Sequence, residues 1–113
     1  MVDQITIIIN SNSKDNWENC KGTGARPVCK CGSWKAHWEC FSRRKWPTKC
    51  AKRNCNERAE VGAHIRKNGI AGEWIAPFCK KCNASTGNED NLFFSIIEGS
   101  ILVSANRSKT CEI

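Results

Sequence analysis

Four cysteines near the middle of the chain have the residue type and spacing of a metal site. They form two pairs, one with four residues between its members and one with two, in the order Cys50, Cys55, Cys79 and Cys82. Structural zinc sites usually take four such ligands in a tetrahedron. The spacing therefore predicts one structural zinc ion. A site closed in this way leaves no open position for water, so any catalysis must come from elsewhere.

A second group of potential ligands lies upstream and consists of Cys29, Cys31, His37 and Cys40. The first two flank a single lysine, and the last two are spaced to share one face of a helix. Two interpretations stay open for this group. Its members either hold a second zinc ion or are ordinary half-buried side chains. Cys111 could replace one ligand of that site or remain a free thiol.

The elements between the two cysteine pairs are expected to bring the pairs together. Residues 60–67 and 73–78 have the composition of strands, and Asn68-Gly69 between them is typical of a hairpin turn. A short helix is expected after the hairpin, with the last two cysteines in its first turn. A knuckle, a hairpin and a helix in this order are typical of a treble-clef zinc finger, which we expect over about residues 48–88.

Three motifs in this region resemble the HNH superfamily, which is built on the treble clef. They are Gly62-Ala-His64-Ile, Trp74-Ile-Ala-Pro and Cys79-Lys-Lys-Cys82-Asn83. With Cys31-Gly-Ser-Trp34 and His37-Trp38 added, the chain also resembles small bacterial and phage proteins that carry a Gly-Ala-His strand.

The HNH resemblance implies that His64 stands where nucleases of this superfamily have a general base. Asn83 would then help to hold a divalent ion such as Mg²⁺. The chain departs from that pattern at Ala63, where many members carry a metal ligand. The alternative is that His64 is a structural residue of the hairpin, and the missing ligands favour this alternative.

The charge of the chain is concentrated in its centre. The net charge is +7, but residues 21–81 hold 15 basic and 4 acidic residues, and the flanks are acidic overall. The densest basic run comprises Arg43, Arg44, Lys45, Lys49, Lys52 and Arg53. Trp46 lies inside this run. Cations beside an aromatic ring suit nucleic acid, with phosphates on the cations and a base on the ring. The alternative is a solvated surface that keeps the protein soluble.

The remaining segments predict a single α+β domain over residues 1–113. Extra strands are expected from both termini, over residues 5–9, 92–97 and 101–105, whereas residues 15–27 look irregular. Ser33 is a good N-cap for a helix that runs to about Arg44. Its apolar stripe comprises Trp34, Trp38 and Phe41, and we expect this stripe and Trp17 to pack in the core.

The beginning of the chain does not have the pattern of a secretory signal. It carries an acid, no basic residue and a run of only five apolar or β-branched residues, and no segment approaches a membrane span. We therefore expect a cytoplasmic protein with reduced thiols, in which paired cysteines bind metal. A secreted protein with disulfides is the alternative, although the nine cysteines are an odd number.

Three functional hypotheses follow from these features. The first is a non-catalytic zinc module that binds DNA or RNA through its basic centre. The second is an HNH-type endonuclease that uses His64, Asn83 and a divalent ion. The third is a protein-interaction module, for example a component of a phage or of bacterial defence, whose basic face contacts an acidic protein.

Overall fold

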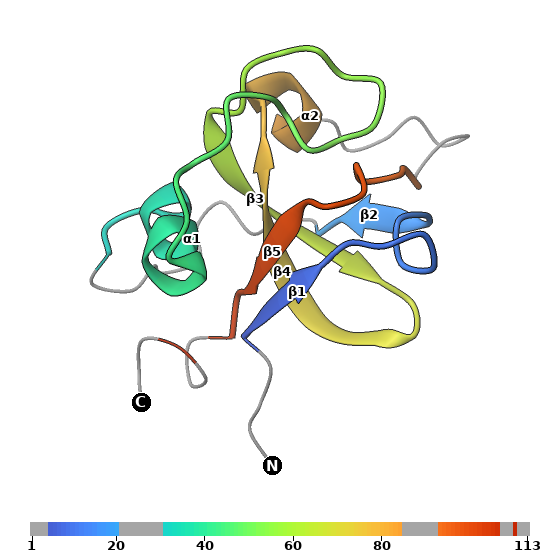
Figure 1. The fold of residues 1–113 in the computed structure, drawn as a ribbon, viewed down its shortest axis with the longest axis horizontal. Helices are drawn as coiled ribbons and strands as arrows, with labels where there is room; N and C mark the ends of the chain where they lie inside the picture. Colours follow the sequence, from blue (N-terminus) through green and yellow to red (C-terminus); the bar gives the residue numbers. More distant parts are fainter. Residues whose placement is uncertain (1–4, 21–30, 85–92, 107–109, 111–113) are drawn as a thin grey trace.

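The chain folds as an α+β protein with one antiparallel five-stranded sheet (Figure 1). The computed structural model describes residues 5–20, 31–84, 93–106 and 110. The sheet has the strand order β1-β5-β4-β3-β2. In chain order the elements are β1 (Thr6–Ile8), β2 (Trp17–Asn19), α1 (Trp34–Ser42), β3 (Val61–Lys67), β4 (Ile70–Phe78), α2 (Lys80–Ala84) and β5 (Ile101–Ser104).

The β3–β4 hairpin is the centre of the sheet and confirms the strands predicted on either side of Asn68-Gly69. Gly69 has a φ of 90°, which a residue with a side chain rarely adopts. The pairing runs from Val61 opposite Phe78 to Lys67 opposite Ile70, with one irregularity near the turn. β4 begins three residues earlier than predicted because the pairing continues to the turn itself.

Both ends of the chain add strands to this hairpin, as predicted. β5 pairs with β4, and β1 pairs with β5 at the edge of the sheet. The prediction of a strand over residues 92–97 is wrong for the described residues 93–97. Leu92 lies outside the described residues. Residues 93–97 form only isolated β-bridges, with Trp17 and with Lys52. The reason is that Ile96 is buried and Phe94 packs against the core cluster that contains Cys50.

A second correction concerns the segment that begins at Asp15, which was expected to be irregular. Its residues 17–19 form β2, which pairs with β3, whereas residues from Lys21 onward lie outside the described part. Trp17 drives this arrangement, since its side chain is fully buried and its indole N–H donates to the carbonyl of Ser13 at 2.6 Å. The prediction that Trp17 packs in the core is thus confirmed.

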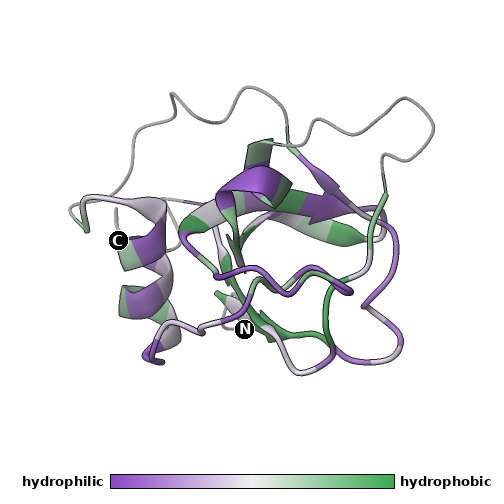
Figure 2. Ribbon diagram, turned by 90° about the horizontal axis from the view of Figure 1, so that it is seen from above, coloured by the Kyte–Doolittle hydropathy of each residue, from purple (hydrophilic) through white to green (hydrophobic). Residues whose placement is uncertain are grey.

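The two faces of the sheet bury different clusters. On one face, Ala63, Ile65 and Phe78 pack with Trp17, Cys50 and Cys79. On the other face, the buried residues are Ile75, Val103 and Trp38. Because side chains alternate between the two faces of a strand, successive buried residues of β3 and β4 belong to different faces of the sheet. In Figure 2, hydrophobic stretches follow the strands of the sheet.

Helix α1 covers the second face with the predicted apolar stripe. It is capped by Ser33, whose hydroxyl accepts the N–H of Ala36 at 3.0 Å, and it ends at Arg43 in a left-handed conformation. The ring of Trp38 is buried, and Trp34 and Phe41 pack beside it. Neither helix in the described part of the chain has the length and apolar character needed to cross a membrane.

Gly62 allows α1 to approach the sheet closely. A Cβ atom at this position would lie 2.8 Å from two atoms of Trp34 and 2.9 Å from the side chain of Ile75. Since one of the Trp34 atoms is backbone, Gly62→Ala should push α1 away and lower the free energy of unfolding by about 1–3 kcal/mol. Chemical denaturation measures this loss, and Ala71→Ser at an exposed position of the same hairpin is the control. Unchanged stability of Gly62→Ala would contradict the packing described for α1.

Candidate metal centre

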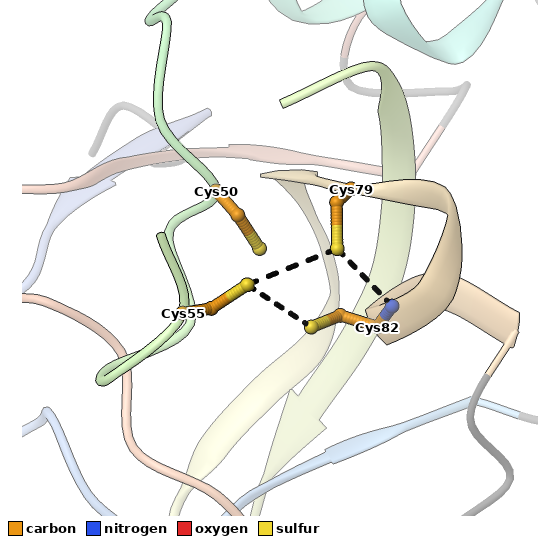
Figure 3. Close-up of side chains that lie close together, drawn as sticks. All are labelled: Cys50, Cys55, Cys79 and Cys82. Atoms are coloured by element: carbon orange, nitrogen blue, oxygen red, sulfur yellow. Dashed lines mark hydrogen bonds between the residues drawn. The ribbon is translucent and has the colours of Figure 1, made fainter. Parts of the chain in front are cut away.

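The four predicted cysteines converge at one point (Figure 3). Two come from the loop after α1, one from the end of β4, and one from α2. Their sulfur atoms all lie within 4.8 Å of one another. The Sγ atom of Cys55 is 3.9 Å from that of Cys79 and 3.7 Å from that of Cys82. Tetrahedral zinc with Zn–S bonds of about 2.3 Å requires sulfur–sulfur edges of about 3.8 Å. The cluster therefore has the size of a four-thiolate metal site.

The first pair is placed by a tight loop that is tied to the sheet. Asn54 has a φ of 69°, and the N–H of Cys55 donates to the carbonyl of Lys52 at 3.2 Å. The N–H of Ala51 donates to the carbonyl of Pro77 in β4 at 2.8 Å. These bonds bring the loop against the strand end from which the second pair begins.

The second pair lies where β4 passes into α2. Cys79 directly follows the strand, and Cys82 is the third residue of the helix. The N–H of Cys82 donates to the Sγ atom of Cys79 at 3.3 Å. From β2, the side-chain amide of Asn19 donates to the carbonyl of Cys82 at 3.1 Å. The metal centre thus joins the loop, the hairpin, α2 and β2.

The most buried thiol of the centre is held in an environment that opposes its ionisation. Cys50 has no exposed surface, and burial raises its pKa. The backbone N–H groups of Cys79 and Lys52 act in the opposite direction on the pKa of Cys50, because they donate to its sulfur. A sulfur atom surrounded by N–H donors but removed from water is suited to a thiolate that is neutralised by a cation.

The pKa values of two other thiols in the cluster shift in opposite directions. A backbone N–H of Glu57 lowers the pKa of Cys55, which is partly exposed. Burial, followed by hydrogen bonding to Cys79, raises the pKa of Cys82. Four adjacent thiolates repel one another in a partly dry site, so their simultaneous ionisation needs a bound metal ion. The arrangement can hold a cation, and the ligands that the described residues bring to it are all sulfur atoms.

His64 lies in the core, away from this centre. Only 4% of it is exposed, and its ring meets that of Trp34 edge-on at 4.4 Å between centroids. Its neighbours in β3, Ala63 and Ile65, belong to the cluster that contains the cysteines, so His64 faces the opposite side of the sheet. Asn83 is exposed on α2. His64 thus lies on the other face of the sheet from the cysteine cluster, whereas Asn83 follows Cys82 directly and donates its N–H to the carbonyl of Cys79 at 3.1 Å.

The second predicted group is described only in part, since Cys29 lies outside the described residues. His37 is fully buried, and its Nε2 atom lies 2.9 Å from the carbonyl oxygen of Ser104. Burial lowers the pKa of His37. Burial raises the pKa of Cys31, and so does the Cys40 thiol, which lies within hydrogen-bonding reach of it. Among the described residues, only the cluster at Cys50 brings three or more ligand atoms together.

Most of the predicted basic residues lie on the surface of the protein. Arg43, Arg44, Lys45, Lys49 and Arg53 are exposed, whereas the Lys52 ammonium lies 5.4 Å from the centroid of the Phe94 ring. The ion pairs in the described part of the chain join Lys14 to Glu98 and Arg66 to Glu18, so none involves this basic run.

Three further cations near the centre were not singled out from the sequence. Arg58 forms a backbone β-bridge with Lys49 in the loop after α1. Lys80 and Lys81 lie in the first turn of α2, between the second pair of cysteines. Their adjacency to the cysteines in the sequence was the available signal.

Comparison of the chain with protein-family models, with curated proteins and with solved structures finds no match. Its function is therefore argued from its own geometry.

Proposed function

We propose that the chain is a zinc-stabilised module of the treble-clef type that binds nucleic acid without catalysing a reaction. Zinc is supported by the donor set, since four sulfur ligands in a tetrahedron are typical of zinc or of iron–sulfur centres, and a single ion fits spacings of 3.7 and 3.9 Å. Cys50, Cys55, Cys79 and Cys82 would hold the ion. Bound in this way, zinc supplies folding energy and leaves no site for a reacting water.

The treble-clef assignment is supported by the order of the elements. The loop with the first cysteine pair precedes the β3–β4 hairpin, and α2 with the last cysteine follows the hairpin directly. The sheet of this chain is larger than that core, because β1, β2 and β5 extend the hairpin on both sides.

One observation carries the nucleic-acid proposal, namely a basic loop without carboxylate partners in the described chain. This basic loop, residues 43–58, holds seven basic residues and one acidic residue. None of the seven forms an ion pair with a described carboxylate. Two of the proposed zinc ligands, Cys50 and Cys55, belong to this loop, so a bound ion would constrain the backbone that carries these cations. Phosphates that replace solvent around such cations release condensed counterions, which favours binding.

The position of His64 argues against the endonuclease hypothesis. A general base must reach the proton that it removes, within hydrogen-bond distance or through one water. The ring of His64 instead packs against Trp34 beneath α1. The protein-interaction hypothesis uses the same basic loop, and a salt-dependent affinity for DNA or RNA separates the nucleic-acid hypothesis from it.

The experiment replaces Arg43, Arg44 and Lys45 with serine and measures binding to labelled DNA and RNA by fluorescence anisotropy over a series of salt concentrations. We expect weaker binding to every sequence. The slope of log K against log salt should fall by about 0.7–0.9 for each phosphate that the variant no longer neutralises. Arg66→Ser is the matched control, since Arg66 is exposed but paired with Glu18 at 3.2 Å. Wild-type protein without affinity for either nucleic acid at low salt would refute the proposal and favour a protein partner.

A further inference from the structure

A groove with a volume of about 270 Å³ lies where the basic loop meets residues 93–95. It is lined by Lys52, Arg53, Asn54, Phe93, Phe94 and Ser95. Two segments far apart in the sequence therefore form its walls. One wall carries two cations and an amide, and the other is formed by Phe93, Phe94 and Ser95.

The aromatic wall is anchored to the core. Phe94 exchanges two backbone hydrogen bonds with Trp17, at 2.8 and 3.0 Å, and its ring meets Phe78 edge-on at 5.5 Å between centroids. Because side chains alternate along an extended segment, an inward Phe94 directs Phe93 outward. Phe93 is 48% exposed, and only Ile8 is a comparably exposed large hydrophobic residue in the described chain.

The cationic wall lies in the basic loop, between Cys50 and Cys55. The N–H of Arg53 donates to the carbonyl of Ser95 at 2.8 Å, and Lys52 forms a backbone β-bridge with Ile96. These contacts fix the backbone of both cations in the groove that Phe93 also lines. In Figure 1, the orange-red segment that leads to β5 begins near β2, in agreement with the Trp17–Phe94 bridge.

We propose that this groove binds single-stranded nucleic acid, with Phe93 stacked on an unpaired base and Arg53 and Lys52 on the adjoining phosphates. The inference rests on the proposed function and specifies its ligand. In a duplex, both faces of each base are covered by neighbouring base pairs, whereas an unpaired base offers a free face to an aromatic ring. An exposed phenyl ring that shares a groove with two cations therefore suits a single strand better than a duplex.

The test measures the binding of wild type, Phe93→Ala and Phe93→Leu to an oligothymidylate of about 15 nucleotides and to a duplex of the same length. Removal of one stacking interaction should weaken single-strand binding on the order of tenfold without changing its salt slope, because every phosphate stays neutralised. Phe93→Leu should bind nearly as weakly, since leucine keeps an apolar contact but has no aromatic face. Phe93→Trp should retain the affinity. Ile8→Ala, at the other exposed hydrophobic position, is the matched control and should bind as wild type.

Arg53→Ser gives a second, independent signature. It should lower the salt slope for the single strand by about 0.7, the value for one neutralised phosphate. Zinc content and thermal unfolding of each variant should match wild type, because Phe93 and Arg53 are both exposed.

The outcomes separate the two proposals. Single-strand affinity that is unchanged in Phe93→Ala overturns the groove proposal while leaving nucleic-acid binding intact. An equal decrease in affinity for single strand and duplex also overturns it, since the ring then contacts something other than an unpaired base. Absence of binding to both probes by wild type refutes the proposed function itself.

Discussion

Removal of the zinc ion that we propose for the four-cysteine cluster is expected to abolish the cooperative unfolding transition of this protein. Structural zinc contributes about 10–16 kcal/mol of apparent binding free energy in small zinc modules, whereas whole domains are stable by only about 5–15 kcal/mol. Cys79→Ser and Cys82→Ser should have the same effect as a chelator at neutral pH. Near-ultraviolet circular dichroism of the five tryptophans, followed during heating, measures the transition.

The reason for so large an effect is the position of the metal centre among the elements. Cys50 and Cys79 are buried in the same cluster as Trp17 and Phe78, so the centre is part of the core. Without a cation, the loop is tied to β4 by few backbone bonds, such as that from Ala51 to Pro77. Adjacent thiols then repel one another as they ionise, which opposes closure of the loop around the four sulfur atoms.

Cys40→Ser is the matched control for these variants. Cys40 is an exposed cysteine on α1 and lies outside the metal cluster. Its replacement should leave both the transition and its response to a chelator as in wild type. A Cys79→Ser variant that unfolds cooperatively without metal at the wild-type temperature would contradict the structural role assigned to the ion.

Trp17→Ala is expected to be the most destabilising substitution outside the metal ligands. The side chain is fully buried, and truncation of a buried tryptophan typically costs about 3–5 kcal/mol through reduced burial and an unfilled cavity. Trp17 also pairs β2 with the segment of Phe94, so its removal should loosen the aromatic wall of the groove. Urea denaturation of the zinc-loaded protein measures the change in stability.

Trp17→Phe provides the comparison. It keeps an aromatic ring and lacks the hydrogen bond from the indole N–H to Ser13, so it should cost less than the alanine variant. Single-strand binding should weaken in Trp17→Ala even when the protein is folded. A decrease in stability below about 1 kcal/mol in Trp17→Ala, which is typical of surface positions, would show that Trp17 does not hold this part of the core.

Local signals in the sequence were sufficient for the central part of the fold. Asn68-Gly69 fixed the position of the hairpin turn, because few dipeptides adopt its backbone angles so readily. Ser33 and the spacing of Trp34 and Trp38 predicted α1 and its buried face. The spacing of the cysteines predicted the metal cluster, because a tetrahedral site constrains which pairs can close around one ion.

The parts that the sequence did not predict depend on tertiary contacts. β2 is only three residues long, and it exists because Trp17 is buried between β3 and the bridge to Phe94. Residues 93–97 have the alternation of a strand, but alternation does not specify the pairing partner. The exposure of Phe93 and its place in the groove therefore follow from tertiary contacts and not from the alternation.

The role of His64 also could not be decided from its motif. A histidine in a strand points to one of two faces, and the face alone does not say whether a helix covers it. Here α1 covers that face, and Gly62 permits the close approach of Trp34. A glycine two residues before the histidine, on the same face, was the available sign that another element packs there.

Native mass spectrometry of the purified protein tests the central claim most directly, because it counts the metal ions bound to the folded chain. The account predicts one zinc ion held by Cys50, Cys55, Cys79 and Cys82, absent from Cys79→Ser and retained in Cys40→Ser. The described cysteines should then carry no disulfide. Wild-type protein that is folded without metal, or a Cys79→Ser variant that keeps the same zinc ion, would contradict it.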